Sequence, residues 1–72
     1  MDNPVLKQMT IENLRSEATA MYEAARKLKL ITDNLDEHLP GADWKAGRNL
    51  EHARQNALRA AEAIENTLDK VK

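Results

Sequence analysis

The sequence contains no cysteine and no phenylalanine, and it has only two glycines, two prolines, one tryptophan and one tyrosine. Without cysteine the chain can form neither a disulfide framework nor a thiolate zinc site. No apolar run approaches the roughly 18 residues of a membrane span, and no charged-then-apolar signal sequence opens the chain. We therefore expect a cytoplasmic protein that does not enter a membrane.

Neither sign of charge dominates the composition. Eleven Lys and Arg residues against twelve Asp and Glu residues leave a formal net charge of −1. This balance disfavours a general polyanion binder such as a histone-like protein, and we expect no DNA partner.

Residues suited to catalysis or metal binding are sparse. Ser16 is the only serine, and neither His38 nor His52 is near it in sequence. No H-E-x-x-H, P-loop or G-x-G-x-x-G motif is present. Four acids surround an expected turn, where we interpret them as solvated or as offsetting a helix dipole: Asp33, Asp36, Glu37 and Asp43. We expect no enzyme activity, no catalytic residue, no metal site and no cofactor.

The chain is short for the core that it can build. It has 72 residues, and eleven of its apolar residues are alanine, which leaves about eighteen large side chains to fill an interior. Domains of this size usually need disulfides, metals or partners for stability. We therefore expect one domain that relies on a partner.

The pattern of breaks predicts a helical hairpin. Pro40-Gly41 is the one strong internal break, because proline cannot continue a helix and glycine permits a turn. Nothing alternates with the period of two typical of strands. The expected fold class is all-α, an antiparallel two-helix hairpin that self-associates into a bundle or ring. It forms a single domain over residues 1–72, with a helix over about 4–39, a turn at 40–43 and a helix over about 44–70.

Apolar residues recur at alternating spacings of three and four in both segments, which predicts two seams. The first seam is Ile11, Leu14, Ala18, Met21, Ala25, Leu28, Thr32, Leu35 and Leu39. The second is Ala46, Leu50, Ala53, Ala57, Ala60, Ile64, Thr67 and Val71, with Gly47, Ala61 and Leu68 beside it.

Capping residues mark the helix ends. Asn3 followed by Pro4 is typical of a helix start, and Thr10 is a second candidate cap that the sequence leaves open. Asp43 is the expected cap of the second helix. We interpret Trp44 as a structural residue that closes the turn over the end of the first seam.

Surplus apolar side chains lie off or at the edge of the seams: Val5, Leu6, Met9, Leu30, Ile31 and Leu58. Such a surplus in so small a chain favours contact with another copy over contact with water. A homodimeric four-helix bundle is the simplest closure, and a higher ring is an alternative.

The charges gather in two basic windows. Residues 24–32 and 44–61 together hold seven basic residues and one acid. If facing residue numbers add to about 83, Lys29 lies level with Arg54 and the windows meet at mid-hairpin. A basic waist of this kind suits a compact anion, with arginine forks for phosphate and with Tyr22 and Trp44 as faces on which a base could stack. The predicted ligand-binding residues are Arg26, Lys29, Arg48, Arg54, Arg59 and Tyr22. The alternative, solvated helix surface paired with nearby acids, stays open.

The stretch from Pro40 to Ile64 resembles the short helical-hairpin proteins of bacteriophages that sequester cyclic nucleotide signals of bacterial immunity, the anti-CBASS and anti-Thoeris hairpin family. The similar features are the turn proline, Leu50-Glu51-His52-Ala53, and the alanine-rich run that ends at Ile64. The resemblance covers about a third of the chain, and the aromatic residue that many relatives carry in mid-helix is missing here.

The resemblance implies a non-enzymatic homo-oligomer, often a hexamer, that binds a cyclic di- or trinucleotide without cleaving it, so the expected assembly ranges from a dimer to a hexamer. It implies a phage anti-defence role in the host-cell cytoplasm. The alternative function is a small homodimeric adaptor or inhibitor that binds a protein partner or structured RNA. The confinement of basic residues to a waist counts against RNA.

Overall fold

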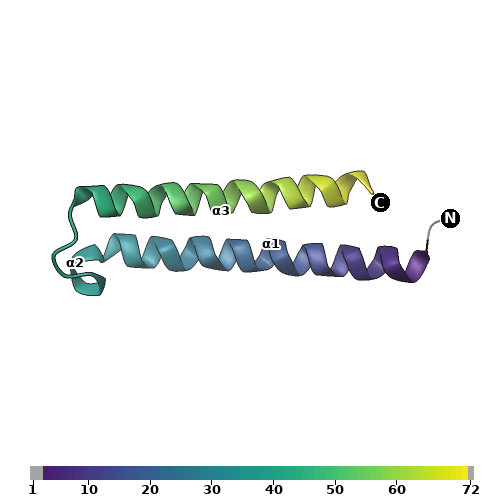
Figure 1. Cartoon of the computed structure of the whole chain (residues 1–72), viewed down its shortest axis with the longest axis horizontal. Helices are drawn as coiled ribbons and strands as arrows, with labels where there is room; N and C mark the ends of the chain where they lie inside the picture. Colours follow the sequence, from purple (N-terminus) through teal and green to yellow (C-terminus); the bar gives the residue numbers. More distant parts are fainter. Residues whose placement is uncertain (1–2, 72) are drawn as a thin grey trace.

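The computed structural model, which describes residues 3–71, is a hairpin of two long antiparallel helices (Figure 1). Helix α1 spans Pro4–Asp33, α2 is a single turn over Leu35–His38, and α3 spans Trp44–Lys70. The hairpin measures 56 × 16 × 14 Å. No strand occurs among the described residues, so the predicted all-α hairpin is confirmed. No helix in that stretch is long and apolar enough to cross a membrane.

Helix α1 begins at the cap predicted from Asn3-Pro4. The Asn3 side chain accepts hydrogen bonds from the backbone N–H groups of Val5 and Leu6, at 3.0 and 3.2 Å. Pro4 occupies the first turn, where a missing N–H is harmless. Thr10 lies inside α1 and donates its hydroxyl to the Leu6 carbonyl at 2.9 Å, so it does not start a separate helix.

The expected continuous helix over 4–39 is wrong at its end. Asn34 leaves helical geometry at φ −124° and ψ 48°, and its carbonyl accepts bonds from two N–H groups of α2. Leu39 then turns extended at φ −135°, as a residue before proline prefers. Pro40 and Gly41 occupy the centre of a tight turn closed by the Ala42 N–H on the Leu39 carbonyl, and Gly41 supplies the required positive φ of 84°.

Helix α3 begins and ends as the sequence predicts. The Asp43 carboxylate accepts a hydrogen bond from the Ala46 N–H at 3.0 Å and caps the helix. Gly47 faces Leu35, because a Cβ added to Gly47 would lie 3.2 Å from a Leu35 methyl group. The residue numbers of this pair add to 82, close to the expected register.

The first predicted seam faces α3 along most of its length. Ala18 and Ala25 are buried, and its larger members from Ile11 to Leu35 are half-buried. The exception is Leu39, which is 45% exposed. The kink at Asn34 and the turn at Pro40 carry Leu39 away from the interface.

The second predicted seam is displaced by part of a turn. Ala53, Thr67 and Val71 are exposed, whereas Ala61 and Leu68, predicted to lie beside the seam, are buried. The face of α3 that meets α1 follows a neighbouring row at the same spacing: Gly47, Leu50, Arg54, Ala57, Ala61, Ile64 and Leu68. Two adjacent rows on α3 have the same spacing, so spacing alone does not show which row meets α1. The row that does so contains Arg54, which a search for apolar residues excludes.

The interior of the hairpin is thin. Among the described residues only Ala18, Ala25, Ala61 and Leu68 are buried. No large side chain in residues 3–71 is fully enclosed. Two helices thus cover each other along a narrow strip and leave most large apolar side chains partly open to water.

Candidate functional site

The six predicted ligand-binding residues divide between two sides of the hairpin. Tyr22, Arg26 and Lys29 follow one another at helical spacing on α1, and Arg54 lies opposite them on α3. We call this side the polar flank. Arg48 and Arg59 lie on the side of α3 that faces away from α1. A single hairpin therefore does not bring all six residues together.

Arg54 is already engaged by its own chain. Its guanidinium donates to both oxygens of the Glu51 carboxylate, with the closest N–O distance at 2.6 Å. Gln55 donates to the same carboxylate at 3.1 Å. The Arg54 side chain is only 23% exposed. These bonds lower the pKa of Glu51 to about 2, and the Glu51 carboxylate raises the pKa of Arg54. A phosphate at Arg54 would either displace Glu51 or bind the remaining guanidinium donors beside its negative charge.

Tyr22 lies in an acidic setting. A hydrogen bond to the Glu65 carboxylate raises the pKa of the Tyr22 phenol, and the charges of Glu65 and Glu62 act in the same direction. Two carboxylates beside the ring disfavour an anionic ligand at this position. The sequence predicts Tyr22 as a surface for a base of an anionic ligand, and the neighbouring carboxylates oppose that role.

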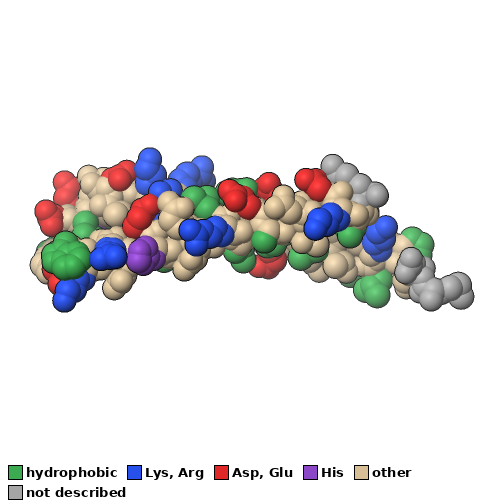
Figure 2. All heavy atoms as spheres, turned by 90° about the horizontal axis from the view of Figure 1, so that it is seen from above, with side chains coloured by type: hydrophobic (Ala, Val, Ile, Leu, Met, Phe, Trp, Pro, Cys, Tyr) green, Lys and Arg blue, Asp and Glu red, His purple; other side chains and the backbone are tan. Residues whose placement is uncertain are grey.

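The remaining four cations are open to solvent. Arg26, Lys29, Arg48 and Arg59 are exposed and make no ion pair within residues 3–71. Figure 2, which looks onto α3, shows Lys and Arg side chains recurring along the length of the hairpin. These four side chains are available to a ligand or to a second copy of the chain.

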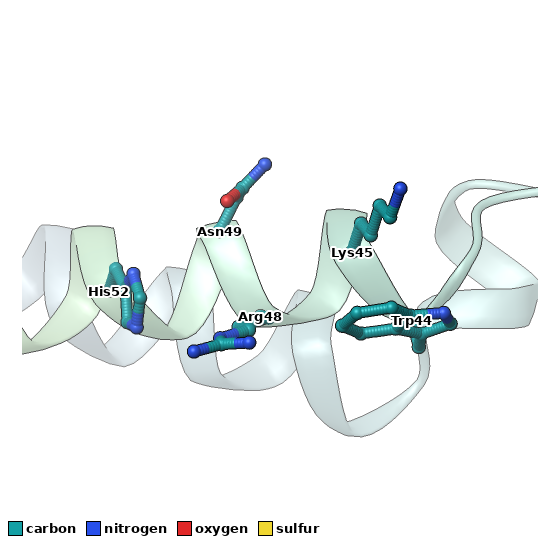
Figure 3. A pocket seen from close by; sticks show the side chains of 5 residues that line it. All are labelled: Trp44, Lys45, Arg48, Asn49 and His52. Carbon is teal, nitrogen blue, oxygen red and sulfur yellow. The ribbon is translucent and has the colours of Figure 1, made fainter.

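Sequence reasoning missed a shallow hollow on the first turns of α3. It has a volume of about 380 Å³ and is lined by Trp44, Lys45, Arg48, Asn49 and His52. Trp44, Arg48 and His52 point to one side of the helix and Lys45 and Asn49 to the other (Figure 3). No carboxylate lines it.

The predicted structural role of Trp44 is wrong. The indole is 68% exposed and does not close the turn over the seam. The Lys45 ammonium lies 5.8 Å from the centroid of the indole ring, within range of a cation–π contact. The signal that could have found the hollow is the spacing of an aromatic, an arginine and a histidine at four-residue steps.

The acids near the turn do not gather into a metal site. Within the described part of the chain, no three His, Asp or Glu side chains are grouped so that they could hold an ion. This agrees with the interpretation of Asp43 as a helix cap.

Comparison with family models, with curated proteins and with solved structures finds no match to this chain.

Proposed function

We propose that the chain is a non-enzymatic binding protein that self-associates and sequesters a compact anionic ligand. The observation that carries the proposal is the thin interior, in which Leu68 is the one large side chain among residues 3–71 that is buried. A chain of this size with so little enclosed surface gains most by covering its apolar side with another copy.

The side opposite the polar flank is the expected contact, and we call it the apolar flank. Helical spacing places on it Met21, Ala24, Leu28 and Ile31 from α1 and Ala53, Ala57, Ala60 and Ile64 from α3. Six of these eight side chains are half-buried, and the two that are exposed are alanines. Each of the Leu, Ile and Met side chains is already mostly covered, so completing its burial contributes roughly 0.5–1 kcal/mol, about a third of the value for full burial. The alanines of α3 allow close approach of a second hairpin.

Assembly through the apolar flank multiplies the cations that are open to an anionic ligand. Each copy contributes Arg26, Lys29, Arg48 and Arg59 as exposed cations. Association through the apolar flank leaves these cations exposed and repeats them in each copy, so that a ligand with several phosphates can meet more than one set without a large net charge on the protein, which favours a small anion over a long nucleic acid. The ligand class that the resemblance implies is a cyclic di- or trinucleotide, and an anti-defence role of a phage protein follows from that class.

A calorimetric titration with a panel of cyclic di- and trinucleotides tests the proposal. We expect submicromolar binding to the intact chain, with unchanged ligand recovered after denaturation. Ala60→Glu, which places a charge on the apolar flank, should abolish both assembly and binding. Ala63→Glu is the matched control, because Ala63 is exposed one turn later on α3 and lies off the flank. Absence of heat with every ligand, or equal binding by both variants, would contradict the proposal.

The adaptor function is favoured by a different observation, the exposed first turns of α1. Val5, Leu6 and Met9 are 69%, 61% and 55% exposed. An adaptor would keep this patch open after assembly for a partner helix. Fluorescence of a hydrophobic dye on the assembled protein distinguishes the two functions. Strong binding that is lost in a Leu6→Ser/Met9→Ser double variant favours the adaptor, and no dye binding favours sequestration.

A further inference from the structure

We infer that the hollow on α3 is a nucleotide-binding site, with Trp44 as the surface for the base and Arg48 as the phosphate ligand. The inference rests on the proposed class of ligand. It goes beyond the predicted basic waist, since Lys45, Asn49 and His52 are not among the residues predicted to bind ligand.

The exposure of Trp44 is the first step. An indole that is 68% exposed contributes little to the hairpin interior. Its flat face is the largest aromatic surface that the chain presents, and aromatic faces stack on bases without regard to sequence. The contact with the Lys45 ammonium, at 5.8 Å from the ring centroid, puts a positive charge beside the same surface.

The order of the lining residues is the second step. Trp44, Arg48 and His52 stand at four-residue steps, each about 6 Å further along the helix. In Figure 3 these three side chains lie in a row along one side of α3. A nucleotide carries its base at one end and its phosphate at the other, and this row presents an aromatic face followed by a bidentate phosphate donor.

The electrostatics of the hollow agree with an anion. Lys45 and Arg48 are exposed, and no acid lines the hollow. Two acids adjoin the lining residues in sequence: Asp43 caps the helix through its bond to the Ala46 N–H, and Glu51 is bonded to Arg54. The one ion pair that involves an arginine within residues 3–71 is at Arg54, so Arg48 keeps its guanidinium for a ligand.

Fluorescence of Trp44 tests the inference directly, because it is the only tryptophan of the chain. The intact protein is titrated with adenosine 5′-diphosphate, with adenosine and with inorganic pyrophosphate. We expect saturable quenching by the diphosphate, and binding about tenfold weaker for either fragment, because each fragment keeps only one of the two contacts. Equal affinity for pyrophosphate and the diphosphate would overturn the role of Trp44, and equal affinity for adenosine would overturn that of Arg48.

Two arginine variants complete the test. Arg48→Ala should weaken binding of the diphosphate about tenfold. Arg15→Ala, at an exposed position on α1 outside the hollow, should leave it unchanged. Equal effects of the two variants would overturn the inference, because the binding would then depend on overall charge. If the diphosphate does not quench Trp44 but calorimetry detects binding of a cyclic nucleotide, the site on α3 is refuted and the proposed function stands. If the diphosphate quenches Trp44 but calorimetry detects no binding of any cyclic nucleotide, the proposed function is refuted and the site stands.

Discussion

Replacing Leu68 by alanine tests the packing of the two long helices. Leu68 is 9% exposed and is the one large buried side chain among residues 3–71. A buried leucine replaced by alanine typically costs about 2–5 kcal/mol, from lost transfer free energy and from the cavity left behind. A chain of this length has a total stability of roughly 4–11 kcal/mol. Leu68→Ala should therefore remove a large fraction of the free energy of unfolding.

Leu30→Ala is the matched control, because Leu30 lies on the same hairpin but is 58% exposed. Leucine and alanine are both good helix formers, so this change should cost less than about 0.5 kcal/mol. The assay is urea unfolding followed by circular dichroism at one fixed protein concentration, since association adds to the apparent stability. A difference between the two variants below about 0.5 kcal/mol would refute the assigned packing.

Two further predictions concern the Glu51–Arg54 pair and the turn. Because the pKa of Glu51 falls from 4.5 to about 2 in the folded chain, its stabilising effect is complete above about pH 5 and is lost as the pH falls toward 2. Thermal unfolding should show this loss, and Glu51→Gln should show a shallower decline over the same range; parallel declines would exclude Glu51 as the source. Gly41→Ala should cost about 1 kcal/mol or more in chemical unfolding, because Gly41 has φ 84° and no side-chain contact to relieve the strain. A stabilised Gly41→Ala variant would contradict the turn geometry.

The sequence was sufficient for the elements of the hairpin because its signals there are local. Asn3 and Asp43 each cap the helix that follows them, and Pro40-Gly41 forms the turn. The break at Asn34 had no such signal, since an asparagine without a neighbouring proline or glycine is compatible with a continuing helix.

The row of α3 that meets α1 could not be predicted because the helix carries two apolar rows side by side. The chosen row contains Arg54, which a pattern of apolar residues excludes. Its charge is neutralised by Glu51 one turn earlier, while the stem of the side chain covers part of the interface. This pairing depends on side-chain geometry, and spacing alone does not reveal it.

The same limit applies to the candidate site. Counting charges along the chain placed Arg54 and Tyr22 in the basic waist, yet the first binds Glu51 and the second lies beside Glu65. Conversely, the place of Trp44 at the start of the second helix predicts a residue that closes the turn, yet its indole is exposed. The folded pair of helices decides which cations are bound by acids of the same chain and which are open to a ligand.

Sedimentation equilibrium of the intact chain at micromolar concentration tests the central claim, that the hairpin acts as an assembly. The monomer has a mass of 8.1 kDa. We predict a mass of two or more times this value for the native chain and for the Ala63→Glu variant. The Ala60→Glu variant should have the mass of the monomer. A helical 8.1 kDa species for the native chain would contradict the claim, because the thin interior would then be sufficient to keep a single hairpin folded.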